Sequence, residues 1–380
     1  MKRMEKYWLM IEPYVYINIA EEGLLLYNTL DGVAIESKES EIMALVRELL
    51  CEENVGVIGL EASTLNRPDV QIFVREMREK YMGDVIDQNL LKVKPVQVLP
   101  IINYPQWRDM GCEFRLLEDW STMLLEVTAH LDRSTDLVRL AAYLQVLPEN
   151  TAIVLEGDPS IFSDALLWEG IVRRSAPKTI ACSYKHCASL TKNSLNGFGY
   201  QITVHFPVDL GCWEASVQWG RSLGDLVSYR FEVASEADCQ AAVGLAEDAA
   251  IEKYQLVPVY TGNNLDFFRK NVFLTHEDIL ATRLTMRDFY RRRAINENDF
   301  GKLHILPNGD IYANRHYPAL GNVATHDFLT IIQKEIKEGC SWLRIRNQEP
   351  CANCLYRDLC PSPSDYELEI GCSNLCCINH

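Results

Sequence analysis

The residues best suited to chemistry are cysteines near the carboxyl end of this 380-residue chain. Two residues separate Cys351 from Cys354, a spacing that lets both sulfurs face one metal ion, and Cys360 follows after a gap of five. Candidates for a fourth thiolate follow at Cys372, Cys376 and Cys377. The spacing therefore predicts a metal site. It does not choose between zinc and an iron–sulfur cluster, since both accept four thiolates.

The composition restricts what the rest of the chain can do. With 37 basic and 53 acidic residues the formal net charge is −16, so the chain lacks the basic surface that binding to nucleic-acid phosphates requires. We find no signal-peptide core and no run of roughly 18 apolar residues, and we expect a cytoplasmic protein without membrane or nucleic-acid partners. The cysteines before the tail are expected to be reduced and mostly buried, at Cys51, Cys112, Cys182, Cys187, Cys212 and Cys239.

Residues 1–90 are predicted to form a small domain of strands and helices. Strands are expected at 15–19, 24–27, 32–35 and 55–60, and helices around 40–49 and 68–79. This order resembles the winged-helix RiPP recognition element, which binds leader peptides of ribosomally made, modified peptides. In that family the leader adds as a strand beside the third strand, against the last helix. The resemblance implies peptide contacts at Val33, Ile35, Phe73 and Met77, although Phe73 and Met77 also fit a helical core stripe.

Residues 91–121 are expected to be a linker with one strand at 96–102. From 122 to 300, six strand-like runs alternate with helical stretches, which predicts a parallel sheet covered by helices and an α/β fold class. The runs are 123–130, 151–156, 179–184, 200–206, 229–234 and 255–260. Six units resemble the partial (β/α)6 barrel of radical SAM enzymes, with a doubly wound sheet as the alternative.

Residues 301–380 are predicted to begin with a β-hairpin around Gly309, followed by a helix at 327–338. With the cysteine run, these elements resemble a SPASM domain, the extension of peptide-modifying radical SAM enzymes that usually holds two auxiliary 4Fe-4S clusters. At two positions where the family has cysteines of the first cluster, this chain has Asn314 and Ser364. The second cluster is retained in this comparison, which implies one 4Fe-4S cluster, or zinc, on Cys351, Cys354, Cys360 and, as the favoured fourth ligand, Cys376.

The predicted barrel lacks the cysteines of radical SAM chemistry. The family carries Cys-x3-Cys-x2-Cys after the first barrel strand, whereas this chain continues from His130 with Leu-Asp-Arg-Ser-Thr-Asp. After the second strand the family has Gly-Gly-Glu-Pro, which engages the methionyl amine of S-adenosylmethionine. The stretch Glu156-Gly157-Asp158-Pro159 is a degenerate version of it. The resemblance therefore implies no cluster that cleaves S-adenosylmethionine and no catalytic residue.

The chain as a whole resembles the pseudo-radical-SAM/SPASM proteins of Bacteroidales-type, GG-leader peptide maturation systems. This implies a noncatalytic component that binds the precursor peptide or a partner radical SAM maturase. Two alternatives stay open, a divergent radical SAM/SPASM enzyme that modifies peptides and a zinc-stabilised binding protein. The sequence has no P-loop, dinucleotide-binding glycine motif or His-Glu-x-x-His motif. Its eight histidines are isolated along the chain, which favours structural roles for His186 and His316.

Overall fold

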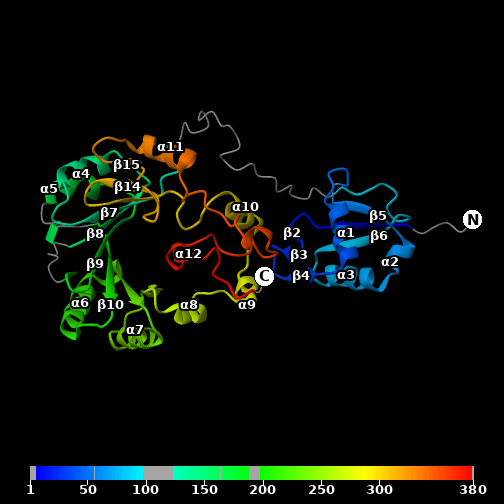
Figure 1. Ribbon diagram of the computed structural model, residues 1–380, viewed down its shortest axis with the longest axis horizontal. Helices are drawn as coiled ribbons and strands as arrows, with labels where there is room; N and C mark the ends of the chain where they lie inside the picture. Colours follow the sequence, from blue (N-terminus) through cyan, green and yellow to red (C-terminus); the bar gives the residue numbers. More distant parts are fainter. Residues whose placement is uncertain are drawn as a thin grey trace, which may run out of the picture.

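The computed structural model describes residues 6–54, 56–96, 123–158, 160–161, 165–187 and 197–378. They form a mixed α/β structure, in which a small amino-terminal domain lies beside a larger domain built on a nine-stranded sheet (Figure 1). Between them lie α9 (His276–Ala281) and α10 (Met286–Ala294), which pack against the small domain. Of the strand predicted at 96–102, all but the first residue falls outside the described residues.

The small domain contains two three-stranded antiparallel sheets, with the strand orders β5-β1-β6 and β2-β3-β4. The strands are β1 Lys6–Ile11, β2 Val15–Ala20, β3 Gly23–Asn28, β4 Ala34–Ser37, β5 Val57–Glu61 and β6 Gly83–Asp87. β2, β3, β4 and β5 correspond to the four predicted strands. β1 and β6 are additional. β1 is the central strand of the first sheet and pairs with β5 on one side and β6 on the other.

Two amphipathic helices, α1 (Ser40–Leu49) and α3 (Pro68–Glu79), cover these sheets and confirm the predicted helices. A short helix, α2 (Ala62–Leu65), precedes α3. α3 begins at a proline, whose fixed φ suits the first helical turn. Both long helices direct an apolar stripe into the domain core. The stripe residues are Ile42, Met43, Val46, Leu49, Val70, Phe73, Val74 and Met77.

The larger domain is organised by six parallel strands whose spatial order follows the chain, from β7 to β12. They are β7 Glu126–Leu131, β8 Ala152–Gly157, β9 Lys178–Ser183, β10 Gly199–His205, β11 Val227–Val233 and β12 Tyr254–Pro258. These strands confirm the predicted parallel sheet. A doubly wound sheet reverses its strand order at a switch point, and this order does not reverse. Because crossovers between parallel strands are right-handed, the connecting helices lie on one face of the sheet.

The connecting helices are α4 Leu137–Gln145, α5 Ala165–Val172, α6 Leu210–Leu223 and α7 Glu236–Asp248. At the other edge of the sheet β13 (Lys302–Ile305) pairs parallel with β7, and β14 (Asp310–Tyr312) and β15 (Gly321–Asn322) continue the sheet in antiparallel fashion. The predicted hairpin is confirmed between β13 and β14, where Gly309 has a φ of 86°. The sheet thus continues past residue 300 into the segment that resembles a SPASM domain.

The rest of the carboxyl-terminal segment consists of loops and short helices. Besides α9 and α10 it contains α8 (Leu265–Asn271), α11 (Phe328–Glu338) and α12 (Asp365–Ile370). α11 confirms the predicted helix and is capped by the Asp327 side chain. Among the residues that the structure describes, no helix combines the length and the apolar character needed to span a bilayer.

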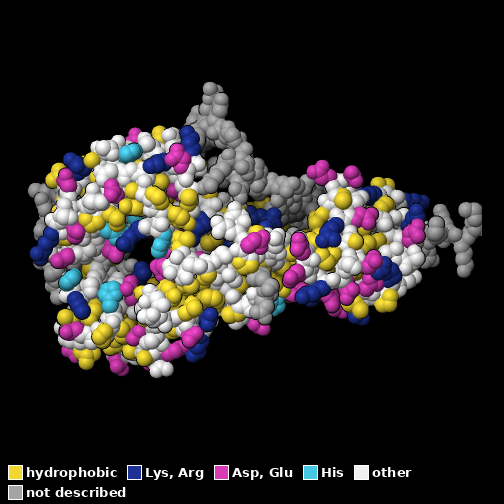
Figure 2. All heavy atoms as spheres, in the orientation of Figure 1, with side chains coloured by type: hydrophobic (Ala, Val, Ile, Leu, Met, Phe, Trp, Pro, Cys, Tyr) yellow, Lys and Arg dark blue, Asp and Glu magenta, His cyan; other side chains and the backbone are white. Residues whose placement is uncertain are grey.

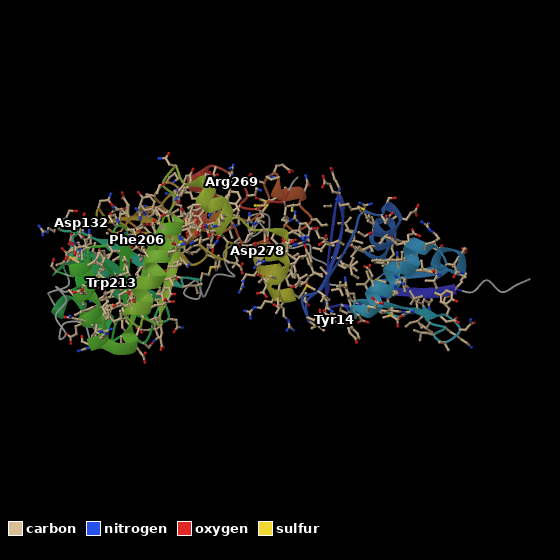
Figure 3. The ribbon with its side chains drawn as sticks, turned by 90° about the horizontal axis from the view of Figure 1, so that it is seen from below. Tyr14, Asp132, Phe206, Trp213, Arg269 and Asp278 are labelled. Atoms are coloured by element: carbon tan, nitrogen blue, oxygen red, sulfur yellow. The ribbon has the colours of Figure 1, made fainter. Side chains whose placement is uncertain are left out.

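An apolar cluster joins this segment to the small domain. Tyr16 and Tyr27 of the β2-β3-β4 sheet pack with Phe289 of α10 and with Leu359 of the tail. The rings of Tyr16 and Phe289 are stacked, with their centroids 3.9 Å apart. Seen from below, α9 with Asp278 accordingly lies between the two domains (Figure 3). β3 is therefore buried on both faces, one by the helices of its own domain and the other by the tail.

Candidate functional site

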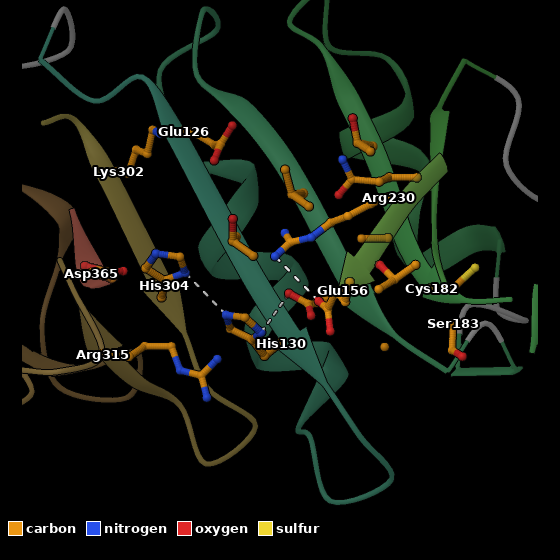
Figure 4. Close-up of a pocket in the computed structure, with 18 of the residues that line it drawn as sticks. Glu126, His130, Glu156, Cys182, Ser183, Arg230, Lys302, His304, Arg315 and Asp365 are labelled. Carbon is orange, nitrogen blue, oxygen red and sulfur yellow. Dashed lines mark hydrogen bonds and ion pairs between the residues drawn. The ribbon is translucent and has the colours of Figure 1, made fainter. Parts of the chain in front are cut away.

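A large polar cavity lies on the face of the nine-stranded sheet opposite the helices. Its volume is about 1190 Å³, and the surface is hollowed there, with histidine and charged side chains around the hollow (Figure 2). Side chains alternate along each strand between the helix-covered core and the cavity. On β7, Val127 and Ala129 are buried in the core, whereas Glu126, Thr128 and His130 line the cavity (Figure 4).

Two histidine–carboxylate pairs lie on this polar face. His130 of β7 is in register with Glu156 of β8, and its Nδ1 lies 3.0 Å from the carboxylate Oε2. His205 of β10 is in register with Glu232 of β11, and the corresponding distance is 2.9 Å. The parallel register thus brings a carboxylate to the same ring nitrogen twice. A proton on Nδ1 donated to the carboxylate leaves Nε2 of each imidazole as a proton acceptor.

The first pair extends to another imidazole. Nε2 of His130 lies 3.3 Å from Nδ1 of His304 on β13, forming the chain Glu156–His130–His304 (Figure 4). Burial lowers the pKa of His304 to about 4, and charge on His130 and Arg315 acts in the same direction. The hydrogen bond from His130 lowers the pKa of Glu156. At neutral pH the carboxylate is therefore ionised and His304 is neutral, an arrangement that can accept and pass on a proton.

The degenerate turn predicted after the second barrel strand forms part of the cavity wall. Glu156 and Asp158 both line the cavity, and Asp158 accepts a hydrogen bond from a backbone N–H that lowers the pKa of its carboxyl. Between them Gly157 has a φ of 156°, and a Cβ there would lie 2.3 Å from the Leu131 carbonyl oxygen. Only glycine fits this position. Pro159 lies outside the described residues.

The described part of the cavity wall contains one cysteine, Cys182 of β9. Burial raises the pKa of its thiol to about 12, so the free thiol stays protonated at neutral pH. Cys182 also lies in the core beside Cys187, as the sequence predicts for both. In the described residues as a whole, no three His, Cys, Asp or Glu side chains are arranged to hold a metal ion.

The cysteines predicted to bind metal lie close together in the tail. Cys351, Cys354 and Cys360 are all buried. Burial raises the pKa of Cys360 to about 12, and charge on any of the other three thiols acts in the same direction. Charge on Cys376 likewise raises the pKa of Cys351 and of Cys354. Such mutual effects require the four sulfurs to be near one another.

The other two candidates for the fourth ligand differ from Cys376. Sγ of Cys372 donates to the Asn374 carbonyl at 3.1 Å, and Cys377 is exposed. Cys376 is held by a β-bridge to Leu274, which lies two positions before the start of α9. The geometry therefore favours Cys376 over Cys372 and Cys377 as the companion of the three buried thiols.

The four sulfurs are not grouped as a formed metal site in the described residues, but the groups around them suit thiolate ligands. Nη1 of Arg346 lies 3.7 Å from Sγ of Cys351, so its guanidinium would offset the charge of bound thiolates. The backbone N–H of Tyr356 donates to Sγ of Cys354 at 3.4 Å, a contact that tunes ligand sulfurs in metal centres. Both features suit zinc and an iron–sulfur cluster alike, so the choice between them stays open.

Hydrogen-bonded polar side chains occupy the two positions where a SPASM domain has cysteines of its first cluster. Asn314 is 3% exposed, and its amide donates to Asp299 at 3.2 Å and to Asp365 at 2.5 Å. Ser364 forms a capping box with Glu367 at the start of α12. Because both replacements have hydrogen-bond partners, they are stable without metal.

The residues predicted to contact a peptide divide into two groups. Ile35, Phe73 and Met77 are buried in the core of the small domain, so these three side chains do not reach its surface. This corrects the expected contact surface, because the apolar stripe of α3 is needed to fold the domain. Val33 is 37% exposed and precedes β4. β4 itself lies at a sheet edge, since among the described residues it pairs with β3 alone.

The cavity histidines are functional candidates that the sequence analysis misses. Although isolated along the chain, five of them line the cavity, namely His130, His186, His205, His304 and His316. The purely structural roles expected for His186 and His316 thus do not account for their position. The sequence of the parallel strands does contain a signal for this cavity. A parallel strand that is covered on both faces is almost continuously apolar. Strands such as β7 and β10 instead alternate polar and apolar residues, which predicts an open polar face.

Comparisons with known proteins add no assignment. No protein-family model matches the chain, and neither the search of curated proteins nor the search of solved structures gives a significant match. The two regions must therefore be interpreted from their own geometry.

Proposed function

We propose that this chain is a noncatalytic component of a ribosomal peptide maturation system and that it binds the leader of a precursor peptide along β4. The observation that carries the proposal is the position of β4, which has a strand neighbour on one side only among the described residues. An extended peptide can add to such an edge through main-chain hydrogen bonds. Leader binding at a sheet edge is also what the resemblance of the small domain to a RiPP recognition element implies.

The register of β4 identifies the groups that a peptide would meet. The backbone N–H of Asn28 donates to the Val33 carbonyl. Because hydrogen-bonded positions alternate in an antiparallel pair, the odd-numbered residues of β4 are bonded to β3. The backbone groups of Ala34 and Glu36 then point to the open side. Nζ of Lys80 donates to the Ala34 carbonyl at 2.7 Å, in agreement with this direction. An incoming strand would replace Lys80 at that carbonyl.

The sequence of the barrel supports a noncatalytic role. The loop after β7 contains no cysteine, whereas a radical SAM enzyme holds its catalytic cluster there. The adjoining part of the cavity is occupied by the His130–Glu156 pair. We therefore assign the modification chemistry to a partner radical SAM maturase that shares the precursor peptide.

The proposal includes one 4Fe-4S cluster on Cys351, Cys354, Cys360 and Cys376. Burial of the first three thiols, the effect of charge on Cys376 on their pKa values and the adjacent Arg346 support it. When bound, the cluster holds the tail in its folded form. Zinc on the same four thiolates is the alternative. An absorption spectrum separates them, since an iron–sulfur cluster absorbs broadly near the blue and zinc does not absorb there.

Fluorescence anisotropy with a fluorescein-labelled double-glycine leader peptide tests the function. We expect micromolar binding by the full chain. Ala34→Pro removes an outward-facing N–H at the first position of an edge strand, where proline is tolerated, and should weaken binding at least about tenfold. Ala34→Ser keeps the N–H and is the matched control, expected to stay within about twofold. No binding by the wild type would reject the function, and equal binding by Ala34→Pro would reject strand addition at β4.

The cavity favours one second candidate, an enzyme with its substrate on the polar face of the sheet. The specific observation is the chain Glu156–His130–His304, which has the groups for proton transfer. The enzyme that the sequence analysis leaves open as an alternative is a divergent radical SAM/SPASM enzyme. Anaerobic reconstitution with iron, sulfide and S-adenosylmethionine, followed by a search for 5′-deoxyadenosine, separates the two functions. Its formation would replace the noncatalytic role, and its absence together with peptide binding would uphold that role.

A further inference from the structure

The loop between two proposed metal ligands, Cys354 and Cys360, lies directly on the sheet that contains β4. The Asn18 side chain of β2 donates to the Leu355 carbonyl at 2.7 Å and to the Cys354 carbonyl at 3.3 Å. At the other end of the loop Leu359 and Cys360 belong to the apolar cluster shared with β2 and β3. The proposed metal loop and the proposed peptide-binding domain are therefore in contact along the whole loop.

A buried ion pair fixes the middle of this loop on the sheet. Asp358 is 4% exposed, accepts a hydrogen bond from the Tyr16 hydroxyl at 2.5 Å, and lies 2.6 Å from Nη2 of Arg293. Removing one partner of such a buried pair leaves an unpaired charge, which is strongly unfavourable. The loop is thus held against the small domain in one position.

Tyr356 links the loop to β4 itself. Its hydroxyl donates to Oε2 of Glu36 on β4 at 2.7 Å, and its backbone N–H donates to Sγ of Cys354. Nε2 of His276, the first residue of α9, lies 3.1 Å from Oε1 of Glu36 and 3.2 Å from the Tyr356 hydroxyl. One residue therefore contacts a proposed ligand sulfur with its backbone and the edge strand with its side chain.

We infer that metal loading of the tail strengthens peptide binding at β4, an inference that rests on the proposed function. A metal bound by Cys354 and Cys360 fixes both ends of the loop and so fixes Tyr356. β4 is short and paired on one side, so its contact with Tyr356 and His276 adds to its order. Without metal the loop stays anchored at Asp358, but Cys354 and Tyr356 lose one restraint, so the contact with Glu36 is less well ordered and the edge becomes a poorer template for a strand. By linkage, bound peptide must tighten metal binding by the same factor.

The test compares the labelled double-glycine leader on metal-loaded and metal-free full-length protein, prepared anaerobically. We expect metal removal to weaken peptide binding about tenfold, and Tyr356→Phe, which leaves every thiol in place, to weaken it about fivefold. Tyr366→Phe is the matched control. It removes a hydroxyl in the same segment that bonds to the Pro258 carbonyl, away from β4, and should leave binding unchanged. Adding Glu36→Gln to Tyr356→Phe should cause less than the additive loss, because the two variants share the Tyr356–Glu36 contact; any further loss reports the contact of Glu36 with His276.

The outcomes separate this inference from the proposed function. If the wild type binds peptide equally well with and without metal, the inference fails and the function stands. If the wild type binds no peptide, the function fails. In that case amide hydrogen exchange at residues 34–37 tests the link between the metal loop and β4 without any peptide. Exchange about tenfold faster after metal removal and in Tyr356→Phe would support a link between loop and edge strand, and unchanged exchange would overturn it.

Discussion

The tail and the cavity are the two chemically distinctive regions of this protein, and they are assembled in different ways. The tail takes its thiols from one short stretch, with Cys351, Cys354 and Cys360 in consecutive turns. The cavity takes its groups from strands far apart in the chain, so that His130 meets His304 only because β7 pairs with β13. A site of the first kind can be recognised from spacing. A site of the second kind becomes visible only when strand register is known.

The two regions also differ in what holds them in place. The tail has little regular structure, so the binding energy of the proposed metal would contribute directly to its folding. The cavity lies on strands whose other face is fully buried, with residues such as Leu155 and Ile202 at 0% exposure. Its side chains are therefore positioned by the sheet without a ligand. Substitutions should therefore affect one region at a time. Loss of a thiol should disturb the tail alone, and a distortion of the strands should disturb the cavity alone.

The largest effect is expected for Cys354→Ala. Loss of one ligand should release the metal, whose binding is worth about 10–16 kcal/mol in small zinc peptides, and should disorder the residues after about Pro350. Limited proteolysis with mass spectrometry should find cleavage there in the variant and not in the wild type. Cys340→Ala, at an exposed cysteine outside the site, is the matched control. A variant tail as resistant as that of the wild type would contradict the structural role of the metal.

A smaller loss of stability is expected for Gly157→Ala, which distorts the cavity wall and leaves the tail unchanged. The new Cβ would meet the Leu131 carbonyl oxygen at 2.3 Å in a backbone conformation that alanine rarely adopts, so unfolding free energy should fall by about 2–4 kcal/mol. Gly244→Ala is the control, because that glycine lies in α7 with nothing within 4 Å and should be neutral or slightly stabilising. Chemical denaturation measures both. Loss of tail metal in Gly157→Ala would show that the two regions are not independent.

Much of the fold could be predicted from the sequence because its signals are local. The alternation of apolar runs gave the six parallel strands, the Asn308-Gly309 turn gave the β13–β14 hairpin, and Pro68 marked the start of α3. The pairing of β13 with β7 could not be predicted in the same way, because no local pattern specifies which strands of a sheet become neighbours. Contact between β3 and the tail was missed for the same reason.

The candidate sites follow the same division. Cys351, Cys354 and Cys360, with Cys376 as the favoured fourth ligand, could be proposed from the sequence because ligand spacing is short-range, and the structure adds the burial of the first three. The histidine–carboxylate pairs were missed because His130 and Glu156 are joined through parallel register across neighbouring strands. Phe73 and Met77 show a limit of resemblance, since a stripe that suits a peptide groove suits a domain core equally well.

His304 should give the stability of the cavity domain a pH dependence. Its pKa is about 4 in the folded chain against an ordinary 6.5, so the unfolded chain binds more protons between these values and stability falls as pH drops from 6.5 toward 4. In His304→Gln the fall in Tm between pH 7 and pH 4.5 should be smaller by about 2–4 °C. His316→Gln, at the exposed rim, is the control. Equal slopes for wild type and His304→Gln would mean that His304 is not buried neutral.

The smallest effect is expected for Cys377→Ala. This thiol is exposed, and its removal should change unfolding free energy by less than about 0.5 kcal/mol and leave the metal content intact. Cys376→Ala is its neighbour and comparison, and should lose the metal as Cys354→Ala does. Metal analysis of the two purified variants decides the matter. The reverse result would assign the fourth ligand to Cys377.

Iron and acid-labile sulfide analysis of anaerobically purified protein tests the central claim most directly. We predict about four iron atoms and four sulfides per chain in the wild type and close to none in Cys354→Ala, because the proposal places one cluster, in the tail. Iron and sulfide retained in Cys354→Ala would place a cluster outside the tail and contradict the account.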